Sequence, residues 1–176
     1  MSGVKKIYRI KSRMNSMPLP ILVDDISKIR KIVKKISTGA EKLAKKFWPG
    51  PLTLIFETNE LGSILTGGRK NIAVRIPNNK FLLSIIREIG CPLIGTSANI
   101  SGGEACRRVV DLDKKILKGI DIIIDGGIVK FGKPSTILNV EKFPYTILRE
   151  GCITKKAIEE FITPPFKVWE RGHKCI

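Results

Sequence analysis

The chain has 176 residues, which suits one domain with a hydrophobic core and is too short for two ordinary domains. It has 32 lysine and arginine residues against 16 aspartate and glutamate residues, a formal net charge of +16, yet 43% of its residues are hydrophobic. This apolar content excludes an intrinsically disordered chain, and no apolar run approaches the ~18 residues of a membrane-spanning helix. The basic start has no apolar stretch behind it, as a signal peptide would. We therefore expect a cytoplasmic protein with no membrane contact.

Cysteine and histidine are too sparse and too scattered for several common kinds of site. Cys91, Cys106, Cys152 and Cys175 include no C-x-x-C pair, and His173 is the only histidine. This argues against a zinc site, a disulfide framework and a Ser-His-Asp or Cys-His arrangement. We expect no protein-held metal. Any chemistry has to come from lysine, arginine, hydroxyl and amide groups, which suit phosphates and carboxylates.

The first half of the chain alternates helical and strand patterns. Two aspartates precede an apolar residue at every third or fourth position up to Ile36, which predicts a capped amphipathic helix ending near Gly39. A shorter helix through Leu43 and Phe47 has to end at the prolines that follow. The next segments predict a strand over 53–58, a strand over 72–76, a helix over 81–89 and a strand over 92–95. The last three have the rhythm of a βαβ unit.

The second half of the sequence predicts two more helices and three more strands. Residues 112–117 favour a short helix, residues 120–124 a strand buried on both faces, and residues 135–140 and 145–148 a pair of strands. Thr154 is predicted to cap a last helix that reaches Ile162. The first few residues and the tail from Thr163 onward are expected to be loose. Together these patterns predict a single α/β domain built on a mixed sheet.

Polar residues that could carry chemistry gather where the predicted strands end. Lys11 and Arg13 lie just before a proline-rich loop, and a loop of small and hydroxyl residues over 95–103 directly follows an apolar strand. Such a loop lets backbone N–H groups approach a phosphate closely, although it can equally be a plain turn. Arg75 and Arg149 each follow an apolar run, where a charged side chain needs a partner. Solvated charge or a structural salt bridge is the alternative for each of these cations.

Six ordered motifs resemble the YrdC-type threonylcarbamoyl-AMP synthase family. They are Lys11-Ser12-Arg13 with Pro18 to Val23, Trp48 to Leu54, Ala73 to Pro77, Thr96 to Gly102, Pro134 to Ile137, and Leu148 to Gly151. The resemblance implies a twisted, mostly parallel, open α/β sheet with flanking helices around a large basic concavity. It also implies a nucleotidyltransferase that makes threonylcarbamoyl-adenylate and pyrophosphate from L-threonine, bicarbonate and ATP for tRNA modification. The resemblance further implies Mg²⁺ bound together with ATP, and a downstream tRNA threonylcarbamoyl-transferase machinery that uses the product.

The resemblance also assigns roles to individual residues. Four of them match the family's catalytic and ATP-binding tetrad, namely Lys11, Arg13, Ser97 and Asn99. Arg149 matches a further nucleotide-binding arginine, and Arg75, Thr96 and Ser135 match positions that hold threonine. We expect Ser97 and Arg149 to lie on one concave basic surface with the rest of the tetrad. This chemistry needs no histidine as a general base, because cations and amide donors offset the negative charge that develops.

The sequence lacks the P-T-x-T-x-Y-G-L motif that precedes the first basic segment in the family. We therefore expect residues 1–163 to form a YrdC-like domain shortened at its N-terminus, with residues 164–176 as a tail. A second hypothesis is a non-catalytic relative that holds tRNA or another structured, double-stranded RNA in the basic concavity. The charge of +16 supports both hypotheses, since neutralising phosphates gives RNA affinity by itself. Ser97 and Asn99 favour the enzyme, because RNA binding alone does not need them after an apolar strand.

Overall fold

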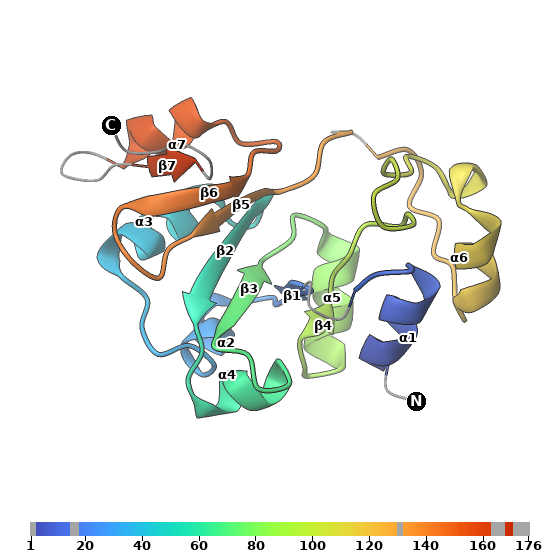
Figure 1. Ribbon diagram of the computed structural model, residues 1–176, viewed down its shortest axis with the longest axis horizontal. Coiled ribbons are helices and arrows are strands. Elements are labelled where there is room, and N and C mark those ends of the chain that lie inside the picture. Colours follow the sequence, from blue (N-terminus) through green and yellow to red (C-terminus); the bar gives the residue numbers. More distant parts are fainter. Residues whose placement is uncertain (1–2, 15–17, 130–131, 163–167, 171–176) are drawn as a thin grey trace. The chain divides into compact units, whose positions relative to one another are not determined.

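The computed structural model describes residues 3–14, 18–129, 132–162 and 168–170 (Figure 1). These residues form two compact units. Unit 1 comprises residues 1–19 and 96–134, and unit 2 comprises residues 20–95 and 135–176. The predicted tail over 164–176 lies outside the described residues except for 168–170, which form a strand of unit 2.

The described part of unit 2 is built on one mixed sheet of seven strands, in the order β4-β1-β3-β2-β5-β6-β7. The strands are β1 (Ile21–Leu22), β2 (Leu52–Glu57), β3 (Asn71–Arg75), β4 (Leu93–Ile94), β5 (Thr136–Asn139), β6 (Tyr145–Arg149) and β7 (Val168–Glu170). Strands β1 and β3, β2 and β5, and β6 and β7 pair in parallel, and the other three neighbouring pairs are antiparallel. The predicted mixed α/β sheet with flanking helices is confirmed.

The predicted βαβ unit has the expected order of elements but not the expected strand direction. Helix α5 (Lys80–Glu88) joins β3 to β4, and it ends before Gly90, which has a φ of 69°. Strand β4 runs antiparallel to β1, and β1 runs parallel to β3. Strands β3 and β4 therefore run in opposite directions, with β1 between them. The strand β1 was not predicted, because two residues beside prolines carry too short a pattern.

The other helices of unit 2 begin at the polar caps that favour them. They are α2 (Ile26–Arg30), α3 (Thr38–Phe47), α4 (Glu60–Leu65) and α7 (Lys155–Phe161). Ser37 caps α3 and Thr154 caps α7, each accepting a hydrogen bond from a backbone N–H in the first turn. The predicted helices over 43–47 and 154–162 are confirmed, and α4 was not predicted.

Helix α2 is much shorter than its apolar spacing predicted. Asp25 caps it as expected, but it ends at Arg30 instead of near Gly39. Val33 instead forms a β-bridge with Thr58, and the side-chain amide of Asn59 donates to the carbonyl of Lys31 at 2.9 Å. These contacts draw the chain into extended backbone along the end of β2. Ile32 and Val33 are buried although both lie beyond the helix, so the apolar spacing reflects burial and not a longer helix.

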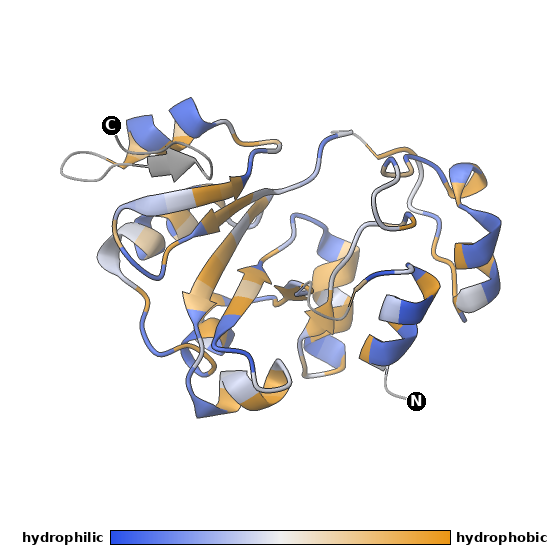
Figure 2. Cartoon of the chain, in the orientation of Figure 1, coloured by the Kyte–Doolittle hydropathy of each residue, from blue (hydrophilic) through white to orange (hydrophobic). Residues whose placement is uncertain are grey.

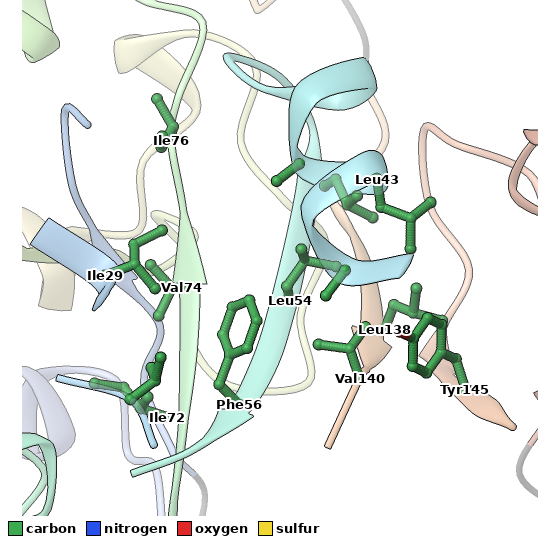
Figure 3. Packing of buried hydrophobic residues seen from close by; sticks show 14 of the residues in the cluster. Ile29, Leu43, Leu54, Phe56, Ile72, Val74, Ile76, Leu138, Val140 and Tyr145 are labelled. Carbon is green, nitrogen blue, oxygen red and sulfur yellow. The ribbon is translucent and has the colours of Figure 1, made fainter. Parts of the chain in front are cut away.

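One face of the sheet carries the hydrophobic core. Figure 3 shows Leu43 of α3 packed near Leu54 and Leu138 of the sheet, and Ile29 of α2 beside Val74. Each such fully buried aliphatic side chain stabilises the fold by about 1.5–3 kcal/mol. In Figure 2 β2 and β3 are hydrophobic along most of their length, whereas α3 and α5 have a polar and an apolar side. Between these core residues, the alternate residues of each strand point to the other face of the sheet.

Unit 1 contains α1 (Gly3–Ile10), α6 (Lys114–Gly119) and a 3₁₀ turn over Val109–Asp111. Helices α1 and α6 lie side by side (Figure 1). Their close approach needs Gly119, because a Cβ there would lie 2.5 Å from Cγ1 of Ile10. Lys6 also donates to the carboxylate of Asp121 at 2.6 Å. The expectation that the first residues are loose was therefore wrong from Gly3 onward.

The predicted buried strand over residues 120–124 was also wrong. These residues are irregular in structure, and Ile122, Ile123 and Ile124 are exposed, Ile122 by 79%. A strand is buried on both faces only as part of a sheet whose two faces are covered, and none of the described strands pairs with this run. Composition predicted the right residue types for a strand but could not supply its neighbours.

Candidate functional site

Lys11 holds the small-residue loop of unit 1 in place. It directly follows α1 and is almost fully buried, with 4% of its surface exposed. Its ammonium donates to the backbone carbonyl of Ser97 at 2.5 Å and to that of Asn99, while its own carbonyl accepts from the N–H of Ser101. Two N–H groups of the ammonium are therefore hydrogen-bonded to the backbone of the loop. Burial, and then the nearby charge of Arg13, lowers the pKa of Lys11 from its ordinary value.

The loop that Lys11 holds exposes the side chains at its start. Thr96 and Ser97 are exposed, and Asn99 is half-buried with its side-chain amide donating to the carbonyl of Gly103 at 2.6 Å. The N–H groups of Ser101 and Gly103 are used inside the unit. The exposed Ser97 hydroxyl is therefore better placed to meet a ligand than the amide of Asn99.

Arg13 follows Lys11 by two positions, and its guanidinium group is held by one backbone carbonyl. Its Nη2 donates to the carbonyl of Pro18 at 3.0 Å. Its Nε and the hydroxyl of Ser101 are buried polar atoms that have no hydrogen-bond partner among the described residues. Ser12, between the two cations, adopts a positive φ of 50° and accepts from the ammonium of Lys115 at 2.7 Å. Unsatisfied buried groups are costly, so this is the part of unit 1 most suited to a water molecule or a ligand group.

In unit 2, three predicted site residues lie at the same end of the sheet. Arg75 is the last residue of β3, Ser135 directly precedes β5, and Arg149 is the last residue of β6. The strand directions bring these ends together across the sheet. Arg149 donates to the Ser135 carbonyl from Nε at 3.1 Å and from Nη2 at 2.8 Å, and its Nη2 lies 3.2 Å from the Ser135 hydroxyl.

Arg75 is half-buried and is held by a backbone carbonyl instead of a carboxylate. Its Nε donates to the carbonyl of Gly50 at 2.8 Å. Burial lowers the pKa of Arg75, Cys152 opposes this shift, and the positive charge of Arg149 adds to it. The positive charges of Arg75 and Arg149 therefore oppose each other, and an anion bound near both would offset this repulsion. The arrangement suits a carboxylate or phosphate group.

The structure thus gathers the predicted residues into two groups, one in each unit. Lys11, Arg13, Thr96, Ser97 and Asn99 belong to unit 1, and the other three belong to unit 2. The prediction that Ser97 and Arg149 share one surface stays a prediction.

Sequence reasoning missed two participants of the group in unit 2, which are Thr53 and the carbonyl of Gly50. The Thr53 hydroxyl lies 2.9 Å from the hydroxyl of Ser135. A signal for Thr53 was present, since it is the only hydroxyl residue within the otherwise apolar first five residues of β2.

The described residues include no group of three or more His, Cys, Asp or Glu side chains that could hold a metal ion. Among these same residues, no helix has both the length and the apolar character required to cross a membrane. The donors of both groups are ammonium, guanidinium, hydroxyl and amide groups.

Comparison with known proteins places the chain in a family. Residues 1–151 match the Sua5–YciO–YrdC family model, which is described as telomere recombination. The chain is 35% identical over 162 residues to the threonylcarbamoyl-AMP synthase of Pyrococcus abyssi, covering 92% of this chain and 48% of that protein. A relative from Methanocaldococcus jannaschii is 41% identical over 152 residues, which cover 86% of this chain and 70% of the relative.

A solved structure shows the same similarity. The crystal structure of P. abyssi Sua5 complexed with L-threonine matches with a TM-score of 0.85 and 33% identity, over 94% of this chain and 48% of that one. The chain spans about half the length of the P. abyssi relative and of a similar Bacillus subtilis protein. The family inferred from the six motifs is confirmed, and the chain belongs to the Sua5–YciO–YrdC family.

Proposed function

We propose that this chain is an L-threonylcarbamoyladenylate synthase, which forms threonylcarbamoyl-AMP and pyrophosphate from L-threonine, bicarbonate and ATP. The observation that carries this proposal is the group of Arg75, Ser135 and Arg149 at one end of the sheet, because two guanidinium groups and a hydroxyl fit anionic substrates. Family membership and the name of the P. abyssi relative support it. The L-threonine bound to P. abyssi Sua5 supports the choice of amino acid.

The reaction requires stabilisation of negative charge more than proton transfer. The amino nitrogen of threonine forms a bond to the carbon of bicarbonate with loss of water, giving a carbamate. A carbamate oxygen then attacks the α-phosphorus of ATP, and the bond from that phosphorus to the bridging oxygen breaks, so that pyrophosphate leaves. Fixed cations and hydrogen-bond donors lower the energy of such a transition state. The donors of both groups are of this kind.

We assign the roles from the motif resemblance together with the contacts that some of these side chains make. Arg75 and Ser135 hold the threonine, and Arg149 binds the nucleotide. For Thr96, the assignment to threonine rests on the motif resemblance alone. Arg13 and Ser97 contact the phosphates directly. Lys11 and Asn99 act mainly by shaping the loop, since their polar groups bond to its backbone.

Magnesium, tRNA and the downstream transfer machinery belong to the same proposal. The described residues have no carboxylate cluster for a metal, so Mg²⁺ would be held by the triphosphate oxygens and not by the protein. The charge of +16 would favour a weak, salt-dependent encounter with tRNA.

The test measures pyrophosphate release by the purified chain with ATP, threonine and bicarbonate, together with detection of threonylcarbamoyl-AMP by mass spectrometry. We expect release to depend on all three substrates and to be lost in Arg149→Ala. The matched control is Arg87→Ala, which removes an arginine whose Nε lies 3.6 Å from Asp24. Release without threonine, or equal loss in both variants, would contradict the proposal.

A further inference from the structure

Thr53 is a buried polar residue of β2 to which the sequence motifs assign no role. Strands β2 and β3 pair antiparallel with Leu54 opposite Val74, so the preceding residue Thr53 faces Arg75. Leu54 and Val74 belong to the core on one face of the sheet, which places Thr53 and Arg75 on the opposite face. The Thr53 side chain is only 1% exposed. A polar group buried this deeply needs a hydrogen-bond partner.

That partner is Ser135, which also contacts Arg149. The hydroxyls of Thr53 and Ser135 lie 2.9 Å apart, and Nη2 of Arg149 lies 3.2 Å from the same Ser135 oxygen. Arginine carries only donors, so Ser135 accepts from it. One hydroxyl hydrogen and one lone pair of Ser135 remain. Thr53 takes one of these two and leaves the other for a ligand.

The second link runs from Ser135 to the guanidinium plane. The Ser135 carbonyl accepts from Nε and Nη2 of Arg149 at 3.1 and 2.8 Å. The Ser135 carbonyl therefore restricts the orientation of the Arg149 guanidinium. Rotation of the Ser135 hydroxyl would make or break one further hydrogen bond to Nη2 of that group. Thr53 is too buried to touch a substrate, so its influence has to pass through Ser135.

We propose that Thr53 is a positioning residue, whose hydroxyl orients the Ser135 hydroxyl and, through it, the guanidinium of Arg149. This inference rests on the proposed function for its activity assays. The hydroxyl, and not the volume of the side chain, is the required feature.

The test compares Thr53→Val, which keeps the shape without the hydroxyl, with Thr53→Ser, which keeps the hydroxyl. In steady-state pyrophosphate release, we expect Thr53→Val to lower kcat/KM for threonine about tenfold, mainly through KM, as loss of one hydrogen bond predicts. Thr53→Ser should stay within about twofold of the native chain. Adding Thr53→Val to Ser135→Ala should cause no further loss, because both changes break the same link.

Thr58→Val is the matched control, since it removes another buried threonine hydroxyl next to β2. Thr58 is 5% exposed and donates to the carbonyl of Arg69 at 2.8 Å, at the opposite end of the strand. Its kinetic constants should match those of the native chain. Equal KM values for the Thr53→Val and Thr58→Val variants, or additive losses with Ser135→Ala, would overturn the positioning role.

A measurement without substrates separates this inference from the proposed function. The Nε–H of Arg149 gives an NMR signal that can be assigned by its loss in Arg149→Lys. We expect the signal to exchange faster with water and to shift in Thr53→Val, and to be preserved in Thr53→Ser. If the native chain releases no pyrophosphate, the proposed function fails and this signal still decides the role of Thr53. An unchanged signal in Thr53→Val would refute it.

Discussion

The ammonium of Lys11 donates to the backbone carbonyl of Ser97. Both residues are expected to bind phosphate, yet this hydrogen bond of Lys11 goes to the loop that carries Ser97. The contact joins the end of α1 to a loop 86 positions later in the chain. Lys11 thus acts on the fold of unit 1 as well as on any ligand. Variants of Lys11 and Ser97 should therefore behave differently.

We expect Lys11→Met to lower the free energy of unfolding by about 1–3 kcal/mol, because it leaves the Ser97 and Asn99 carbonyls without their donor. Urea unfolding followed by circular dichroism measures this. Lys115→Met is the control, since it removes an exposed lysine that bonds to the Ser12 hydroxyl, and such surface changes usually stay within about 0.5 kcal/mol. Equal stability of the two variants would show that the Lys11 contacts contribute nothing.

The pH dependence of stability provides a second test of Lys11. Burial lowers the pKa of Lys11 from its ordinary value of 10.5, so the folded protein loses this proton at a lower pH than the unfolded chain does. Between the two pKa values the unfolded chain binds more protons, and stability therefore rises with pH. The stability difference between the native protein and Lys11→Met should stay constant near neutrality and increase as the pH approaches 10.5. A constant difference over the whole range would indicate an unshifted lysine.

Ser97→Ala should weaken ATP binding without changing stability. The Ser97 side chain is exposed, and its contact with Lys11 uses the backbone carbonyl, which alanine retains. Loss of a hydrogen bond to a charged phosphate predicts about 1–3 kcal/mol of lost affinity. Titration calorimetry measures the affinity, and a melting curve of the same sample checks the fold. Native affinity in this variant would remove Ser97 from the nucleotide site.

Arg75→Lys should raise the KM for threonine at least about tenfold while changing that for ATP much less. A lysine ammonium cannot keep the bond to Gly50 and also present a planar pair of donors to a carboxylate. Steady-state kinetics with each substrate varied in turn measures the two constants. If both KM values rose equally, Arg75 would serve the fold or the nucleotide instead of threonine.

The limits of sequence-based prediction follow from the range of the interactions involved. Helix α7 was predictable because its capping residue Thr154 lies next to it, and the end of α3 was predictable because prolines follow Phe47. The site residues could be named because motifs are local. The contact between Thr53 and Ser135 joins residues 82 positions apart, and only the pairing of β2 with β5 brings them together. The same reasoning explains the error at residues 120–124, whose burial depended on strands elsewhere in the chain.

The exposed isoleucines 122–124 affect how concentrated the protein can be in solution. Branched apolar side chains in a segment without strand pairing are typical of stretches that promote precipitation, and fixed charges beside them oppose it. Asp121 and Asp125 flank this run in a protein that is otherwise strongly basic. Ile123→Lys should therefore raise the concentration at which light scattering begins, and leave the melting temperature unchanged. If this short segment limits solubility, that single substitution should have a larger effect than its added charge alone would produce on a chain of net charge +16.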